Sequence, residues 1–186
     1  MKEAVRIVVL AALATVVTVA ALSLADHGQP SKSPAKNTAA TIQPASLACK
    51  LLTLEDATAV LGRGTAAVPG QPEIHGDDVS ITTCNYTVVT GKGANDSRSI
   101  TLLVRLPKNA EAARYNKANF GVQKPAGVQD VAGIGDAAYW AASISQLNVL
   151  VGDTWYIIGN TTGQSAGHGT LDTSRAIYNQ IKQKLD

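Results

Sequence analysis

One loop near the C-terminus brings a serine and a histidine together in an order that some hydrolases use. Residues 163–167 read Gly-Gln-Ser-Ala-Gly, the pattern of a nucleophile elbow, and His168 follows directly. An elbow requires a strand that runs straight into a sharp turn and a helix, with the acid and then the histidine later in the chain. Ser165 lies instead in the middle of a polar loop. A serine hydrolase using this loop is therefore the less favoured alternative, and we assign no catalytic residue.

The three histidines do not form a metal-binding pattern. His27, His75 and His168 all lie in predicted loops, and none has a cysteine or a second histidine at the spacing of a zinc site. A site built from His75, Asp77 or Asp78 and His168 would require distant loops to meet. We expect neither a metal nor a cofactor.

Aromatic residues are scarce, at 4% of the chain, and half of them fall in two dipeptides. Tyr139-Trp140 and Trp155-Tyr156 lie on neighbouring predicted strands, where adjacent side chains point to opposite faces. The rings can fill an otherwise aliphatic core. Alternatively, one ring lies at the mouth of an apolar groove and binds a small apolar ligand. The sequence thus names Tyr139, Trp140, Trp155 and Tyr156 as candidate ligand-binding residues.

Residues 133–138, Gly-Ile-Gly-Asp-Ala-Ala, fit a loose dinucleotide-binding pattern. That motif holds a pyrophosphate at the start of a helix, whereas the residues that follow here indicate a strand. The better interpretation is a tight turn in which Asp136 bonds the local backbone.

The N-terminus predicts export. Residues 7–25 contain no charged residue, and 19 residues of helix, at about 1.5 Å each, cross the apolar part of a bilayer. The segment also fits a signal peptide cleaved after Ala25. Residues 1–25 are therefore a signal peptide or a transmembrane anchor, with residue 26 onward outside the cytoplasm and the membrane as a partner through residues 7–25. No cysteine near the end of the segment could carry a lipid.

The residues after this segment divide into a tether and a domain. Residues 26–46 are rich in Pro, Ser, Ala and Lys and cannot bury enough apolar surface to fold, so we expect a disordered tether. Residues 47–186 then form a single exported domain. The formal charge of only +2 gives no basic stripe, so we expect no nucleic acid as a partner.

The two cysteines, Cys49 and Cys84, lie in the exported part. In an oxidising compartment an isolated pair is more simply a disulfide than a metal site. A closed loop of about 36 residues would stabilise the fold by about 4 kcal/mol in the chain-entropy model.

Hydrophobic periodicity and turn residues predict helices and hairpins in alternation. Thr53 is a good N-cap for a short helix that ends at Gly62, and Gly152-Asp153 suits a type II′ turn. In the next two helices the apolar stripes predict which residues face inward. They are Ala112, Tyr115 and Ala118 or Asn119 in the first, and Ala176, Ile177, Ile181 and Leu185 in the second. The expected helices cover 53–62, 107–121 and 172–185, and the expected strands cover 79–90, 98–106, 137–145, 147–151 and 154–158. The order α-β-β-α-β-β-β-α predicts an α+β fold, an antiparallel β-sheet with helices packed on it.

Several short motifs together resemble a known group of proteins. They are Cys49 with Leu51-Leu52-Thr53, Cys84-Asn85-Tyr86, the run from Gly133 to Trp140, Leu147 with Val149, and Gly152-Asp153. Over about residues 47–186 the chain resembles small exported cell-envelope proteins of unknown function, many of them actinobacterial lipoproteins. The resemblance implies a cell-envelope domain with a disulfide and no assigned catalysis, and similar layouts occur in extracytoplasmic sensor domains and PsbP-type sandwiches. This chain departs from the lipoproteins in lacking the acylated cysteine.

These features favour an extracytoplasmic small-ligand-binding or sensing module. The alternatives are a structural or protein-interaction domain of the envelope and a hydrolase that uses the loop around Ser165.

Overall fold

The computed structural model describes residues 46–70, 73–91, 96–162 and 169–185. Within these ranges eight strands form one sheet in the order β1-β3-β4-β8-β7-β6-β5, with β2 beside β3, and every pair of neighbours is antiparallel. The strands are β1 (Ala66–Val68), β2 (Ile74–His75), β3 (Val79–Val89), β4 (Ser97–Pro107), β5 (Gln129–Asp130), β6 (Ala137–Ala141), β7 (Gln146–Val151) and β8 (Thr154–Thr162). The helices are α1 (Leu47–Leu51), α2 (Leu54–Leu61), α3 (Ala110–Val122) and α4 (Leu171–Lys182), with a 3-10 helix at Ala142–Ile144. The predicted α+β fold is confirmed.

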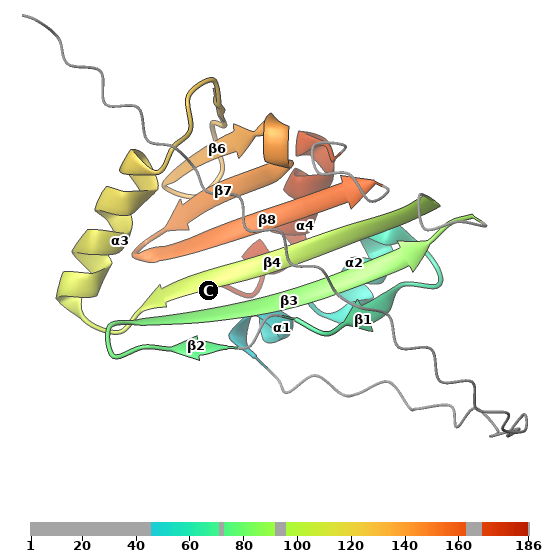
Figure 1. Cartoon of the computed structure of the whole chain (residues 1–186), viewed down its shortest axis with the longest axis horizontal. Helices are drawn as coiled ribbons and strands as arrows, with labels where there is room; N and C mark the ends of the chain where they lie inside the picture. Colours follow the sequence, from blue (N-terminus) through green and yellow to red (C-terminus); the bar gives the residue numbers. More distant parts are fainter. Residues whose placement is uncertain (1–45, 71–72, 92–95, 163–168, 186) are drawn as a thin grey trace, which may run out of the picture. The chain divides into compact units, whose positions relative to one another are not determined.

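The two faces of the sheet are covered to different extents. Helices α1, α2 and α4 lie behind the sheet in Figure 1 and pack on what we call the covered face. Alternate residues of the long strands point to this face and form the main core, among them Cys84, Leu102 and Ile158, each with no exposed surface. Helix α3 lies across one end of the other face, which we call the open face. Along β3, β4 and β8 the side chains of the open face are mostly half-exposed, except Trp155, which is buried beneath α3.

The hairpins form as predicted. Strands β3 and β4 pair over eleven residues, from Val79 opposite Pro107 to Val89 opposite Ser97. The turn between β7 and β8 has φ +58° at Gly152 and no positive φ at Asp153, in agreement with a type II′ turn. Strand β6 is shorter than predicted: it ends at Ala141 because the 3-10 helix and the left-handed Ser145 turn the chain into β7.

Helix ends follow local chemistry. Thr53 accepts a hydrogen bond from the backbone of Asp56 and Asp56 accepts one from the backbone of Thr53, so that α2 begins with a full capping box. Gly62 ends α2, as predicted. The sequence did not predict α1, a single turn of five residues capped by Ser46, which is the last residue of the expected tether.

The inward faces of α3 and α4 differ from the prediction. Helix α3 buries Ala112, Ala113, Asn116 and Phe120, whereas Tyr115 is 63% exposed. Helix α4 buries Tyr178 beside Ile177 and leaves Ala176 exposed. The predicted Ile177 and Ile181 are buried in α4, whereas in α3 the ring on the inward face is that of Phe120 and not that of Tyr115.

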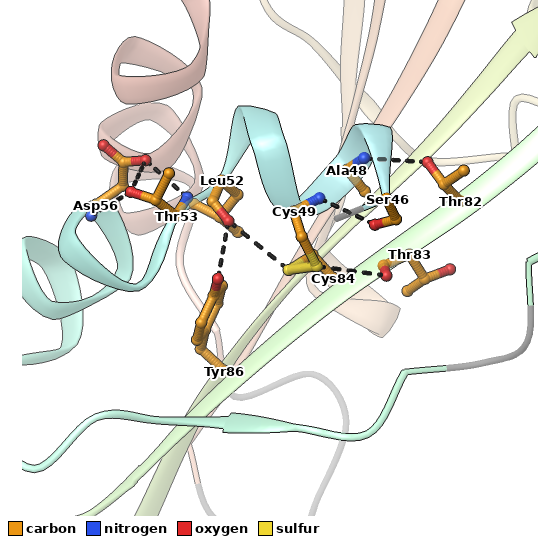
Figure 2. The surroundings of a disulfide bond; sticks show 10 residues. All are labelled: Ser46, Ala48, Cys49, Leu52, Thr53, Asp56, Thr82, Thr83, Cys84 and Tyr86. Atoms are coloured by element: carbon orange, nitrogen blue, oxygen red, sulfur yellow. Dashed lines mark hydrogen bonds between the residues drawn. A yellow bond between two sulfur atoms is a disulfide. The ribbon is translucent and has the colours of Figure 1, made fainter. Parts of the chain in front are cut away.

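The predicted disulfide is present and joins α1 to β3 between Cys49 and Cys84, which have a sequence separation of 35. Figure 2 shows the bridge beneath a set of hydrogen bonds that hold the same region: Tyr86 donates to the carbonyl of Leu52 at 3.0 Å, and the backbone N–H of Ala48 donates to the Thr82 hydroxyl at 3.1 Å. Cys84 has no exposed surface. The bridge therefore attaches the first helical turn to the middle of strand β3.

The turn at residues 133–136 is held by distant backbone, which corrects our expectation for Asp136. Its backbone N–H donates to the carbonyl of Leu150 at 2.8 Å, and its carboxylate accepts the N–H of Gly152 at 2.7 Å. Gly135 has φ +57°, and a Cβ there would lie 2.4 Å from the Leu150 oxygen. Gly135 thus allows a close approach of this turn to the β7–β8 hairpin.

Replacing Gly135 by alanine should destabilise the fold by more than about 1 kcal/mol, because an L-residue is strained at this φ and its Cβ meets backbone that cannot move aside. Urea unfolding of Gly135→Ala measures the loss. Gly133→Ala is the control: Gly133 also has a positive φ, but nothing lies within 4 Å of its Cβ position. Equal losses in the two variants would contradict the steric argument.

Asp56 connects the capping box to the C-terminal segment. Burial by itself raises the pKa of this carboxyl group, but hydrogen bonds from Lys184 and Thr53 outweigh that effect and leave the pKa below its ordinary value of 3.8. A group whose pKa is lowered on folding stabilises the native state above its unfolded pKa, and this contribution is lost as the pH falls through the folded pKa.

We therefore expect the wild-type protein to have a larger free energy of unfolding than Asp56→Asn at pH 6. This difference should shrink as the pH falls below about 4. Unfolding free energies measured by denaturant between pH 6 and pH 2.5 give this difference directly. Lys184→Gln should remove part of the same pH dependence, since Lys184 donates to the carboxylate. A difference that stays constant over the whole range would contradict the assignment.

The predictions for residues 1–25, for residues 26–45 and for Ser165 with His168 concern parts of the chain outside the described residues. Within the described ranges, no helix has the length and apolar character needed to cross a membrane.

Candidate functional site

The four predicted aromatic residues divide between the two faces of the sheet, as strand alternation requires. Trp140 and Tyr156 join the main core on the covered face. Tyr139 and Trp155 form a second cluster on the open face with Phe120 and Leu150. The exposed fractions are 3% for Tyr139, 6% for Trp140, 3% for Trp155 and 7% for Tyr156. None of them is the exposed ring that a stacking platform would need.

A small pocket nevertheless opens beside the second cluster, where α3 ends and the open face begins. Its volume is about 150 Å³. The walls come from the segment after α3 and from the open-face residues of β6, β7 and β8: Gln123, Pro125, Tyr139, Ala141, Ile144, Gln146, Asn148, Trp155 and Ile157. We call this site the ring pocket, because Tyr139 and Trp155 form part of its wall. Two of the four candidates that the sequence named, Tyr139 and Trp155, line this cavity.

The strand register explains why these residues meet. Ile157 of β8 lies opposite Asn148 of β7, which lies opposite Tyr139 of β6. Gln146 is the partner of Ala141 in the next row. Because side chains in a row point to the same face, three strands contribute adjacent groups to one patch of the open face.

Two interactions fix the aromatic wall. Phe120 of α3 packs against Tyr139 with ring centroids 5.1 Å apart and against Trp155 in a T-shaped contact at 5.5 Å. The indole N–H of Trp155 donates to Oδ1 of Asn148 at 3.0 Å, and Asn148 is itself 4% exposed. This bond satisfies the buried indole and orients the Asn148 amide, so the pocket is formed before a ligand arrives.

The ring pocket carries no formal charge. None of its lining residues is an acid or a base, and burial raises the pKa of Tyr139 above its ordinary value of 10.0. The phenol therefore stays protonated and neutral in the physiological range. Primary amides supply its main hydrogen-bonding groups, and each can both donate and accept.

Tyr156 reaches a different, wider depression of about 660 Å³ on the far side of the β7–β8 turn. Its walls also include Lys108, Asn109 and Asp153, which belong to a strand end, a helix cap and a turn. A wide surface formed by the ends of helices and strands holds a ligand less firmly than walls formed by paired strands. We therefore base the functional argument on the ring pocket.

A hydroxyl, an imidazole and a carboxylate form a short hydrogen-bonded chain at the β2–β3 hairpin. His75 lies 3.0 Å from the Ser80 hydroxyl through Nδ1 and 2.8 Å from the Glu73 carboxylate through Nε2. No motif in the sequence predicts this hydrogen-bonded set, because the hairpin brings together residues whose spacing matches no known pattern. The His75 side chain is 58% exposed, so water competes for both bonds. This chain joins the two strands of the hairpin.

Metal binding finds no support in the described residues, which contain no group of three or more potential His, Cys, Asp or Glu ligands. Asp78 of the proposed zinc set accepts a hydrogen bond from the Asn109 amide at 2.8 Å instead. His168, the other member of that set, lies outside the described residues.

No protein-family model matches this chain, and neither a curated protein nor a solved structure matches it. The resemblance to small exported cell-envelope proteins therefore remains a prediction. Its motif residues have structural roles here: Leu52 and Tyr86 hold α1, Thr53 caps α2, and Gly135 allows the close approach to β7. The disulfide is consistent with an oxidising, extracytoplasmic setting.

Sequence reasoning missed Phe120, Gln146 and Asn148 as site residues. A lone phenylalanine near the end of a predicted helix carries no sign that it will cover two rings from different strands. Asn148, however, could have been found, because a polar residue in the middle of the apolar run Leu147–Val151 is unusual and indicates a buried hydrogen bond.

Proposed function

We propose that this chain is an extracytoplasmic module that binds a small ligand in the ring pocket. The observation that carries the proposal is the pocket itself, a cavity whose aromatic wall is fixed by Phe120 and by the Trp155–Asn148 hydrogen bond. It opens onto the part of the sheet that α3 leaves uncovered. A preformed cavity with a few oriented polar groups is the usual form of a ligand site.

Binding fits the chemistry of this pocket better than catalysis. Amides and a neutral phenol can orient a ligand, but they do not exchange protons readily near neutral pH. The lining contains no carboxylate, imidazole or thiol. We therefore propose recognition or sensing as the role of the site.

The proposed setting is the outer side of the cytoplasmic membrane. The uncharged segment 7–25 would act as an anchor or as a signal peptide cleaved near Ala25, and residues 26–46 would hold the domain away from the bilayer. The disulfide supports this setting because such bonds persist in oxidising compartments. The partners would then be the membrane and an envelope ligand.

The two tryptophans give an internal control for a binding test, since one lies at the pocket and the other in the main core. We expect small cyclic compounds to shift the indole N–H resonance of Trp155 in a saturable manner in spectra of the ¹⁵N-labelled full chain. The resonance of Trp140 should stay in place. Trp155→Phe and Trp140→Phe assign the two signals. A panel of neutral, acidic, basic and apolar rings that leaves Trp155 unmoved would refute the proposed site.

The enzymatic alternative needs a separate test. A serine-directed fluorophosphonate probe applied to the full chain should leave both Ser165 and Ser80 unlabelled if the module only binds. Labelling that Ser165→Ala abolishes would favour the hydrolase instead. Labelling that Ser80→Ala abolishes would give the hydrogen-bonded set of Ser80, His75 and Glu73 a catalytic role. An interaction domain would show neither labelling nor a response of Trp155 to small ligands.

A further inference from the structure

We propose that the ring pocket takes one uncharged, hydroxyl-bearing six-membered ring, the terminal sugar of a glycan, and that the next sugar lies on the open face across Gly159. This inference rests on the proposed binding function and specifies its ligand class. Size, charge, hydrogen bonding and the surface beyond the pocket each contribute an independent argument.

The size of the pocket sets the first limit. A cavity of about 150 Å³ accommodates a single six-membered ring, since an engineered cavity of this volume in another protein binds benzene. A lipid chain or a fused ring system would need more room. The occupant is therefore one ring, with any further part of the ligand outside.

The charge of the pocket sets the second limit. A buried carboxylate or ammonium group needs an opposite charge as a partner, and the walls offer none. Charged side chains lie near the pocket but do not line it: Asp130 is the partner of Tyr139 in the pocket's own row and is paired with Lys124, and Arg105 is the partner of Trp155 in the next row. A neutral ring should therefore bind in preference to acidic or basic rings of the same size.

The polar groups of the pocket match hydroxyls. Gln123, Gln146 and Asn148 each combine N–H donors with a carbonyl acceptor, and a hydroxyl also donates and accepts. Ile144 and Ile157 provide apolar wall for the C–H faces of a sugar ring. A hydrocarbon ring would remove water from the Gln146 amide and offer it no hydrogen bond in return, which costs binding free energy.

The surface beyond the pocket suits a second sugar. Gly159 lies between Thr101 of β4 and Gln146 of β7 in one row of the open face. Because Gly159 has no side chain, the surface of the sheet is lower at this position than at its neighbours. Half-exposed hydroxyls follow on the far side, at Thr101, Ser99 and Thr161. A second sugar leaving the pocket would meet hydroxyl groups and no charged side chain in these two rows.

The full chain is titrated with methyl glycosides of glucose, galactose, mannose and N-acetylglucosamine, and the shift of the Trp155 indole resonance measures binding. At least one neutral glycoside should bind ten times or more tightly than the matching uronic acid, amino sugar and cyclohexanol. No response to any of the four glycosides, together with binding of cyclohexanol or a charged ring, would overturn the sugar assignment and leave the proposed pocket in place. No response of Trp155 to any compound would overturn both.

Two variants test the geometry. Gln146→Leu removes one amide and should weaken glycoside binding at least tenfold, while cyclohexanol binds as well or better. The control Gln183→Leu, at the exposed C-cap of α4, should change neither affinity.

Gly159→Val should lower the affinity for the disaccharide of the preferred sugar to that for the monosaccharide. A Cβ at Gly159 would lie 3.8 Å from Thr101 and 4.0 Å from Gln146, which leaves room for a side chain, and unchanged monosaccharide binding by Gly159→Val checks that the variant is folded. Undiminished disaccharide binding in Gly159→Val would overturn the path across β8.

Discussion

Reducing the Cys49–Cys84 disulfide should lower the free energy of unfolding by about 4 kcal/mol, the largest single loss that we expect in this chain. The bond closes a loop with a sequence separation of 35, and in the chain-entropy model opening such a loop restores that much disorder to the unfolded state. The effect on the native state adds to this loss, because α1 is a single turn and cannot persist without tertiary contacts.

Urea unfolding with and without a reductant measures the loss. The matched control is Cys49→Ala with Cys84→Ala, which should have low stability in both conditions and show no response to the reductant. Hydrogen exchange should locate the first change at α1, where Leu52 accepts the Tyr86 hydroxyl bond at 3.0 Å. Equal stability of the oxidised and reduced wild-type protein would show that hydrogen bonds and packing alone hold α1.

Replacing Asn160 by leucine should cost about 3 kcal/mol or more, because the side chain is 5% exposed and makes three hydrogen bonds. Its amide donates to the Thr170 carbonyl at 3.0 Å and to the Ser174 hydroxyl at 2.7 Å, and its oxygen accepts the Thr170 N–H at 2.8 Å. Leucine has nearly the same volume but leaves these buried groups without partners. These bonds connect the end of β8 to the start of α4.

The control for Asn160 is Asn179→Leu on the exposed side of α4, which should change stability by less than about 0.5 kcal/mol. Asn160→Asp separates the bonds: it keeps the acceptor for Thr170 but loses both donors and places a carboxylate beside a carbonyl oxygen. We expect its loss to grow between pH 4 and pH 7 as the carboxyl group ionises. A loss in Asn160→Leu no larger than in Asn179→Leu would contradict the role of Asn160 as a buried connector.

Sequence patterns determined those parts of the structure that depend on neighbouring residues. Alternation in residues 98–106 predicted a strand with one apolar face, Thr53 with Asp56 predicted a capped helix, and Gly152 predicted the type II′ turn. Each of these signals acts within a few residues, so it survives in the folded protein. The pairing of two cysteines likewise needs no three-dimensional information when the chain has only two.

Only the tertiary structure decided which face of each element lies inward and which residues meet. Tyr115 was expected inside and lies outside, because α3 packs on the sheet through the ring of Phe120 instead. In α4 Ile177 is buried as expected, whereas Ala176 is exposed and Tyr178 is buried. The ring pocket depends on the order β8-β7-β6, which brings Ile157, Asn148 and Tyr139 into one row. Strand order and helix rotation follow from packing between residues far apart in the chain, and periodicity within one segment carries no information about that packing.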